Sequence, residues 1–381
     1  MFGGREKTLD SFPRAMLTTP IPYPFRARQR ALRELLEAQR IPVLVVTKPV
    51  NIYYLTGFRG SAGAAVLGRD HNLLLVDPRY TLQAQNQARG VEVAETKDSM
   101  LKAVAKRASG DRLRRAGFED THLTFSDFEF LRHEARDGLR WVPAGGLVEN
   151  LRAVKDEAEI EQIRQSCRLT SEVFEAILKL VKPGVRESDL AAEIEHRMKK
   201  QGAEGSAFET IVASGPRAAL PHGRASEKRL QSGELVIFDL GAILGGYASD
   251  MTRTVYLGTP PRRVKALYRA VLQSQQQAAA VVGDGISARA VDAKARQVLQ
   301  PYGLAKHFTH STGHGVGLEI HEQPRIARTE KSRLRRSQVV TVEPGIYLEG
   351  FGGIRIEDTI AIGNDGPEAL TVASKDNWIL D

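Results

Sequence analysis

The stretch that decides the fold runs from Glu234 to Gly258 and reads ELVIFDLGAILGGYASDMTRTVYLG. Its two apolar runs are separated by Gly245 and Gly246, a pattern typical of two strands joined by a turn. Asp239 ends the first run and Asp250 opens the second. An antiparallel hairpin is expected to place these two carboxylates side by side at its centre.

A second copy of this pattern occupies Val339 to Gly363, VVTVEPGIYLEGFGGIRIEDTIAIG. Glu343 takes the position of Asp239, two residues before a glycine, and Glu357 takes the position of Asp250, two residues before a threonine. The chain therefore contains an internal repeat that brings two acids on each of two hairpins.

Four carboxylates gathered inside a fold cannot all stay ionised unless cations neutralise them. Two divalent ions carry four positive charges and would balance the four acids. The repeat therefore predicts a site for two metal ions.

Length and composition limit the class of protein. A chain of 381 residues exceeds the usual size of one hydrophobic core, so two domains are expected. No apolar run approaches the roughly 20 residues of a membrane helix. Residues 1–20 mix charges and prolines and lack the apolar core of a signal peptide, which predicts a cytoplasmic protein without membrane contact. The single cysteine, Cys167, excludes an internal disulfide and is interpreted as structural.

The net charge of +8 does not indicate nucleic-acid binding. The basic residues are scattered along the chain, and aromatic residues do not alternate with them as a base-stacking surface requires. A solvated basic surface is the interpretation, and no nucleic acid is expected as a partner.

Hydrophobic periodicity divides the chain into two domains. Helices and apolar strands alternate through residues 1–148, which predicts an α/β domain. In residues 149–381 the order helix, helix, strand, hairpin occurs twice, which predicts a duplicated α+β domain. The expected elements are helices at 26–39, 154–180, 187–201, 264–282 and 287–299, and strands at 43–46, 73–76 and 211–213.

The segment HFTHSTGHGVGLEIHEQPR, residues 307–325, holds four histidines and three glycines. The glycines argue against a helix, so His310 and His314 are expected on an extended strand, where residues four apart share a face. His314 is the preferred nitrogen ligand because a glycine on each side lets other backbone approach closely. His307 is interpreted as structural.

These observations give a set of five metal ligands, with mostly oxygen donors and one imidazole. Such donors suit two adjacent Mn, Co, Zn or Fe ions rather than a structural zinc, which prefers thiolates. Two ions can activate a water and polarise a carbonyl, so hydrolysis is the expected reaction class. The glycines do not form GxGxxG and no serine lies in GxSxG, which argues against dinucleotide binding and a serine hydrolase. The five residues are Asp239, Asp250, His314, Glu343 and Glu357.

The ordered ligands and the motifs around them resemble the creatinase and aminopeptidase P group of metallopeptidases. The resemblance implies a pita-bread catalytic domain, duplicated about a pseudo-twofold axis, preceded by a smaller creatinase-like α/β domain. It covers nearly the whole chain. The motifs are NIYYLTGFRGSAGA from residue 51, VDPRYTLQA from 76, LRAVKDEAEIEQIR from 151, PHG from 221, HSTGHGVGLEIHE from 310, EPGIY from 343 and GIRIED from 353.

The resemblance also implies roles for the site residues. The five ligands would hold two ions, usually manganese, with Asp250 and Glu357 bridging them, and Glu343 would also take the proton of the attacking water. His222 and His321 would steady the substrate carbonyl and the tetrahedral intermediate. Two further residues, His310 and Arg355, would line the site behind these groups.

Members of the resembled group cleave the bond before proline, so short proline-containing peptides are the expected substrates and a homodimer the expected assembly. Arg325 matches the cation that holds the free carboxylate of a dipeptide in dipeptide-specific members. Arg79 and Tyr80 look more like the corresponding residues of the aminopeptidases that accept longer peptides. For Arg325, the alternative to a role in substrate binding is a surface salt bridge. Another possibility is a non-catalytic pita-bread binding protein, although such relatives typically lose metal ligands.

Overall fold

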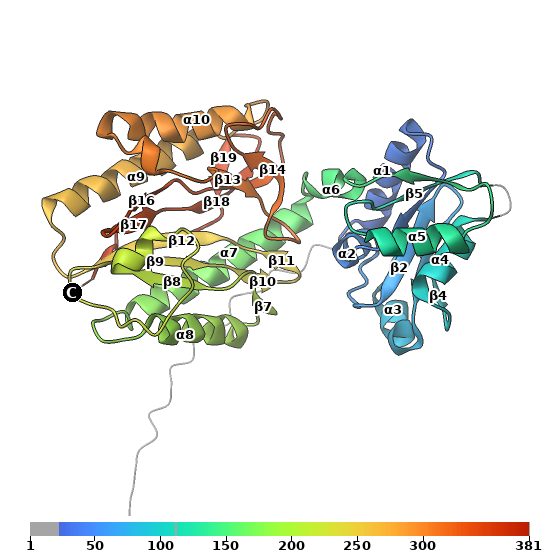
Figure 1. Cartoon of the computed structure of the whole chain (residues 1–381), viewed down its shortest axis with the longest axis horizontal. Helices are drawn as coiled ribbons and strands as arrows, with labels where there is room; N and C mark the ends of the chain where they lie inside the picture. The colour runs from blue at the N-terminus through green and yellow to red at the C-terminus, as the bar shows by residue number, and fades with distance from the viewer. Residues whose placement is uncertain (1–22, 111–112, 381) are drawn as a thin grey trace, which may run out of the picture.

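The computed structural model describes residues 23–110 and 113–380, which form two parts placed next to each other along the longest axis (Figure 1). Residues 1–20, on which the signal-peptide argument depends, lie outside the described residues. Within the described part of the chain, no helix is long and apolar enough to cross a membrane.

The N-terminal part is a mixed α/β domain, as predicted. Its elements are α1 (Phe25–Ala38), β1 (Val43–Val46), α2 (Pro49–Thr56), β2 (Gly63–Gly68), β3 (Asn72–Val76), η1 (Pro78–Tyr80), α3 (Thr81–Gln87), β4 (Glu92–Glu95), α4 (Met100–Ala108), β5 (Arg115–Phe118), α5 (Phe125–Glu134) and β6 (Arg140–Pro143). The strands form one sheet in the order β4-β3-β2-β1-β5-β6. In β1, Leu44 and Val46 belong to the core with α1 and α2, whereas Val43 and Val45 belong to the core with α4 and α5. Helices therefore cover both faces, and this explains the unbroken apolar run of β1.

A short helix, α6 (Leu147–Arg152), leads from this domain to α7 (Glu157–Leu178). Asp156 and Glu159 form a capping box at the start of α7, which sets where that helix begins. The predicted domain boundary between residues 148 and 149 falls inside α6 and stays a prediction.

The remaining chain repeats one arrangement, as the sequence pattern predicted. The first copy contains α7, α8 (Glu187–Lys200), β7 (Gly205–Ser206), β8 (Ile211–Ser214), η2 (Gly215–Ala219), β9 (Leu235–Leu240), β10 (Ala242–Leu244), β11 (Tyr247–Ala248) and β12 (Met251–Leu257). The second contains α9 (Arg262–Ala280), α10 (Ala288–Leu299), η3 (Gln300–Tyr302), η4 (Ala305–His307), β13 (Gly313–Gly315), β14 (Glu322–Ile326), β15 (Val339–Val342), β16 (Gly345–Leu348), β17 (Gly352–Arg355), β18 (Asp358–Ile362), β19 (Pro367–Ala369) and β20 (Ile379–Leu380).

Each copy has its own core between a helix pair and strands. Residues of α7 and α8 pack with β8, β9 and β12, and residues of α9 and α10 pack with β15 to β18. Figure 1 shows α9 and α10 on one side of the central strands, with α8 on the other. Cys167 of α7 is buried, and burial raises the pKa of its thiol to about 12, in line with its structural interpretation.

The first acidic ribbon, residues 234–258, corrects one prediction. Asp239 stands opposite Thr252, and Asp250 lies two residues earlier than Thr252, just before β12, so the two acids are diagonal neighbours and not a directly opposed pair. The two-residue turn of Gly245 and Gly246 sets this register. Residues two apart share a strand face, so both acids still point to the same side.

In the second acidic ribbon, residues 339–363, Val342 pairs with Asp358. Glu343 and Glu357, one residue further along each strand, therefore stand directly opposite each other. Its closing loop, residues 349–351, is one residue longer than the turn of the first ribbon. The two copies therefore differ in register while keeping their acids on one face.

Candidate metal centre

The ten side chains that the sequence singled out all line one cavity of about 1080 Å³. They come from strands and loops of both repeats, although up to 135 residues separate them along the chain. They are His222, Asp239, Asp250, His310, His314, His321, Arg325, Glu343, Arg355 and Glu357.

Three of the five predicted ligands form the tightest group. One ligand atom each from Asp250, His314 and Glu357 lies within 4.8 Å of the others, and all three residues are buried. The Nε2 atom of His314 lies 3.4 Å from Oδ2 of Asp250 and 3.6 Å from Oε1 of Glu343. Carboxylate and imidazole atoms therefore converge on one small volume.

The surroundings of His314 leave its Nε2 atom free to bind a cation. Its Nδ1 atom lies 3.1 Å from the carbonyl oxygen of Gly315, which can only accept, so Nδ1 carries the hydrogen. A Cβ atom on Gly313 would lie 1.9 Å from the Thr341 carbonyl oxygen, and one on Gly315 would lie 2.2 Å from the carbonyl oxygen of the facing strand. The glycines permit this close approach, as predicted. The strand is shorter than expected, however, because β13 begins at Gly313 and leaves His310 in the preceding loop.

Two carboxylate oxygens show that the acids have unused binding capacity. Oδ1 of Asp239 and Oε1 of Glu357 are buried and have no hydrogen-bond partner among the described residues. The other oxygen of Glu357 accepts a hydrogen bond of 2.7 Å from the Thr252 hydroxyl. A buried carboxylate oxygen without a partner is costly unless a cation binds it. The donors present therefore fit divalent metal ions.

The protonation of these acids supports the same conclusion. Burial raises the pKa of Asp250 well above its ordinary value, and the neighbouring charges of Asp239 and Glu343 raise it further. Burial also raises the pKa of Glu343. The pKa of Glu357 is raised by burial and by the negative charge of Asp250. Without cations, these carboxyl groups would tend to be protonated. A bound metal ion requires them in the ionised form, so a cation would stabilise the cluster.

Arg355 corrects the charge count made from the sequence. Its guanidinium is buried and donates from Nη2 to Oδ2 of Asp239 at 2.6 Å. It also donates to the Tyr347 hydroxyl at 2.7 Å and to the Pro221 carbonyl at 3.1 Å. One of the four negative charges thus has a protein cation beside it, so charge balance alone does not set the number of metal ions. Arg355 also ties the loop that carries His222 to the acids.

His310 is a neutral neighbour of the cluster. Its Nδ1 atom donates to the Ser311 carbonyl at 2.7 Å, so Nε2 accepts from the Tyr347 hydroxyl at 2.8 Å. Burial and the charge of Arg355 lower the pKa of His310 to about 4. At neutral pH this histidine therefore adds no charge beside Glu343, whose Oε2 atom lies 3.9 Å away.

The outer part of the cavity carries the remaining predicted residues. His222 and His321 are exposed side chains in loops, and the ring centroid of His321 lies 4.3 Å from that of His314. Partial burial lowers the pKa of His321, and the neighbouring His314 and His222 lower it further, so its imidazole is neutral at neutral pH. Arg325 is exposed and forms no ion pair with a described acid.

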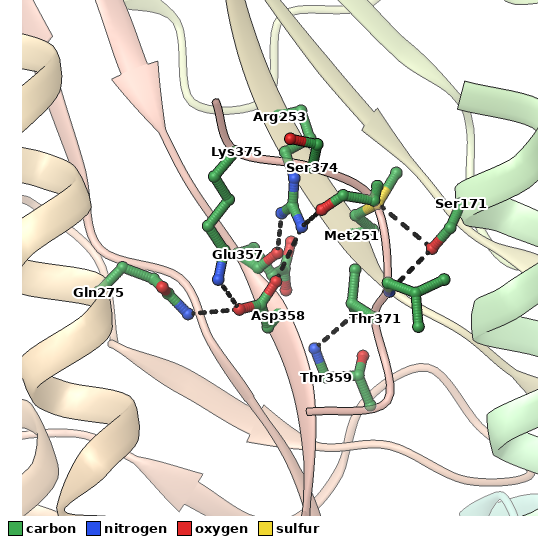
Figure 2. Close-up of polar contacts among 12 residues, drawn as sticks. Ser171, Met251, Arg253, Gln275, Glu357, Asp358, Thr359, Thr371, Ser374 and Lys375 are labelled. Atoms are coloured by element: carbon green, nitrogen blue, oxygen red, sulfur yellow. Dashed lines mark hydrogen bonds and ion pairs between the residues drawn. The ribbon is translucent and has the colours of Figure 1, made fainter. Parts of the chain in front are cut away.

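Behind the acids lies a buried polar cluster that the sequence interpretation missed (Figure 2). Asp358 follows Glu357 and accepts from Arg253 at 2.9 Å, from Gln275 at 2.9 Å and from Lys375. Arg253 also donates to the carbonyl oxygen of Glu357. These contacts hold the backbone of Glu357 in place from the side away from the cavity. The acidic pair in GIRIED was the available signal, since adjacent strand residues point to opposite faces.

Comparisons with known proteins agree with this geometry. Residues 28–154 match the creatinase/prolidase N-terminal domain, and residues 161–364 match metallopeptidase family M24. The chain is 36% identical to a Xaa-Pro dipeptidase of Pyrococcus horikoshii over 345 residues, which is 90% of this chain and 96% of that protein.

Solved structures with the same fold include both kinds of enzyme considered above. A Xaa-Pro dipeptidase from Bacillus anthracis has a TM-score of 0.90 and 38% identity, and the similarity covers 93% of this chain and 100% of that one. An X-Pro aminopeptidase from Thermotoga maritima has a TM-score of 0.84 and 34% identity, covering 90% and 100% of the two chains.

Proposed function

The chain belongs to metallopeptidase family M24, and from this premise we propose that it hydrolyses the bond before proline in Xaa-Pro dipeptides. The observation that carries the proposal is the convergence of Asp250, His314 and Glu357 in one buried cluster, within a cavity that is also lined by the exposed Arg325. Similarity to proteins named Xaa-Pro dipeptidase supports it.

The proposed metal site consists of the five predicted ligands and takes two divalent ions. Manganese is the first choice, with cobalt, zinc and iron as alternatives. When bound, the ions supply the positive charge that polarises a peptide carbonyl and acidifies water. Asp250 and Glu357 would be central to holding the ions, since each places a carboxylate oxygen within 4.8 Å of the other and of a His314 nitrogen.

The other residues move the proton and stabilise charge. Glu343 is the proposed base, which accepts a proton from the attacking water. The imidazoles of His222 and His321 are each proposed to donate an N–H to the carbonyl oxygen as it gains negative charge. Arg355 would position Asp239 directly, and His310 would act on Arg355 through the Tyr347 hydroxyl that both residues contact.

Recognition of proline and of substrate length lies on the open side of the cavity. An Xaa-Pro bond has no N–H on its nitrogen, so enzymes that depend on that donor fail there. Arg325 is the proposed partner of the free carboxylate of a dipeptide, since an unpaired guanidinium binds carboxylates through two parallel hydrogen bonds. The aminopeptidase alternative predicts equal use of longer peptides.

The homodimer, the cytoplasmic location and the division at residues 148–149 are part of the same proposal. Short peptides are the proposed partners, and neither nucleic acid nor membrane is included. Light scattering on the purified protein tests the assembly, and a mass of about 42 kDa, that of one chain, would contradict the dimer.

We expect the manganese-loaded protein to cleave Gly-Pro and Ala-Pro, and to leave Pro-Ala and Ala-Gly intact. Amino-acid release by chromatography measures this, and a chelator should stop it until manganese is restored. Hydrolysis of Ala-Gly as fast as Ala-Pro would contradict proline specificity. Tight binding of Ala-Pro without hydrolysis would favour the non-catalytic binding protein.

Arg325→Ala should lower kcat/KM for Ala-Pro by about 10- to 100-fold, because a charge-assisted pair with the carboxylate is worth roughly 1.5–3 kcal/mol. The tripeptide Ala-Pro-Gly, whose carboxylate lies one residue further on, should lose less. Arg328→Ala is the matched control, since it removes the same charge from a neighbouring cavity. Equal losses for both peptides, or for both variants, would mean that Arg325 does not read the carboxylate.

A further inference from the structure

The turn that carries His321 is held from behind by one carboxylate. His321 is the last residue between β13 and β14, and Glu322 is the first residue of β14. The Glu322 carboxylate accepts the backbone N–H of Glu319 at 3.1 Å. A Cβ atom on Gly317 would lie 2.6 Å from Oε2 of Glu322, so the turn is packed directly against this group.

Two buried cations fix that carboxylate. Nη2 of Arg152 donates to Oε1 of Glu322, and Nζ of Lys155 donates to Oε2 at 2.9 Å. The side chains of Arg152, Lys155 and Glu322 are 2%, 0% and 5% exposed, so solvent does not weaken these ion pairs. Burial alone would raise the pKa of Glu322, but the charges of Lys155 and Arg152 hold it at about 2.

Arg152 and a further cation, Lys48, connect the turn to the N-terminal domain. Arg152 and Lys48 donate to Oε2 of Glu319 at 2.8 and 2.7 Å. Nη1 of Arg152 donates to Asn51 at 2.7 Å, and Asn51 in turn donates to Glu119 at 2.6 Å. Glu319 is therefore held in part by Lys48 of the N-terminal domain, whereas Glu322 is held by Arg152 and Lys155 of the segment that joins the two domains.

We propose that Arg152, Lys155 and Lys48 are positioning residues that hold His321 at the cavity. Through Lys48 and the contact between Arg152 and Asn51, the N-terminal domain becomes part of the catalytic apparatus. The inference rests on the role proposed above for His321. Buried ion pairs add little net stability because both charges lose their hydration, but they specify one geometry. A displacement of about 1 Å in a group that contacts the reacting atoms can cost about 100-fold in rate.

The test compares Arg152→Met with Arg28→Met. Arg28 is a matched control because it is also a buried arginine that joins the N-terminal domain to the start of α7, through Asp156 at 2.6 Å, without touching the turn. Arg152→Met should lower kcat for Ala-Pro by about 10- to 100-fold with KM within about 2-fold, the pattern of a contact made in the transition state. Arg28→Met should change kcat by less than about 3-fold.

A double-mutant cycle shows whether Arg152 acts through His321. In a His321→Ala background, Arg152→Met should cost less than about 2-fold in kcat, because the group it positions is gone. An equally large loss in that background would overturn the proposal, as would equal effects of Arg152→Met and Arg28→Met. If Arg152→Met does not fold, Lys48→Met takes its place in the cycle, since Lys48 is partly exposed and contacts the same turn.

Hydrogen exchange gives a readout that does not depend on activity. In Arg152→Met, amides of the peptide covering residues 316–322 should exchange about 10-fold faster than in the wild type, while Arg28→Met leaves them unchanged. Unchanged exchange in Arg152→Met would overturn the positioning claim. A wild-type protein that cleaves no Xaa-Pro peptide would contradict the proposed function instead. The exchange rates would still show whether Arg152 holds residues 316–322 in place.

Discussion

Replacing Asp250 with alanine is expected to lower kcat/KM for Ala-Pro by about 1000-fold or more and to remove about half or more of the bound metal. Asp250 is 6% exposed, belongs to the tightest ligand group and lies 3.4 Å from Nε2 of His314. Asp239 and Glu343 are themselves proposed ligands, so neither is a spare carboxylate that could replace the one removed. Activity assays and elemental analysis of the purified variant measure both losses.

The fold should survive this change. Burial and nearby acids raise the pKa of Asp250, so the carboxyl is a destabilising group when no cation is bound. Circular dichroism should therefore match the wild type. Asp365→Ala, at an exposed position, is the control and should keep both metal and activity. Full activity in Asp250→Ala would remove this residue from the site.

The parts of the fold that could be predicted depend on local patterns. The apolar run of β1 and the periodic helices α1, α8 and α9 are visible within short windows, because burial of a strand or helix face repeats with a fixed period. The internal repeat also allowed a prediction about residues that are far apart in the sequence. It paired Asp239 with Glu343 and Asp250 with Glu357 across about a hundred residues, and the structure brings all four to one cavity.

The parts that could not be predicted depend on contacts between distant segments. The registers of the two ribbons follow from closing loops that differ by one residue, a detail that the spacing of the acids does not reveal. The Arg355–Asp239 pair spans 116 residues and the Arg152–Glu322 pair spans 170. An arginine that pairs with an acid in the interior looks in sequence like any surface arginine, because only the fold decides which charges lose water together.

Removal of the metal ions is expected to make the stability of the protein depend strongly on pH. Burial raises the folded-state pKa of Asp250 and Glu357 well above their ordinary values of 3.8 and 4.5. A raised folded-state pKa contributes stability that is fully present below the unfolded pKa and is lost as pH rises through the folded one. The stripped protein should therefore be most stable near pH 4 and lose stability as pH rises to 8.

The loaded protein should behave in the opposite way, because ionised carboxylates bind cations better as pH rises. The gap in Tm between loaded and stripped protein should widen with pH and reach about 10 °C at pH 8, as expected for ions at several hundred times their Kd. Differential scanning calorimetry from pH 5 to pH 8 measures it. Stripped Asp250→Asn is the control and should lose less stability over this range, since it has one buried ionisable group fewer. A stripped wild type whose Tm is constant or rises with pH would show that the acids are not held together in a buried cluster, and a metal centre built from both ribbons would then have no physical basis.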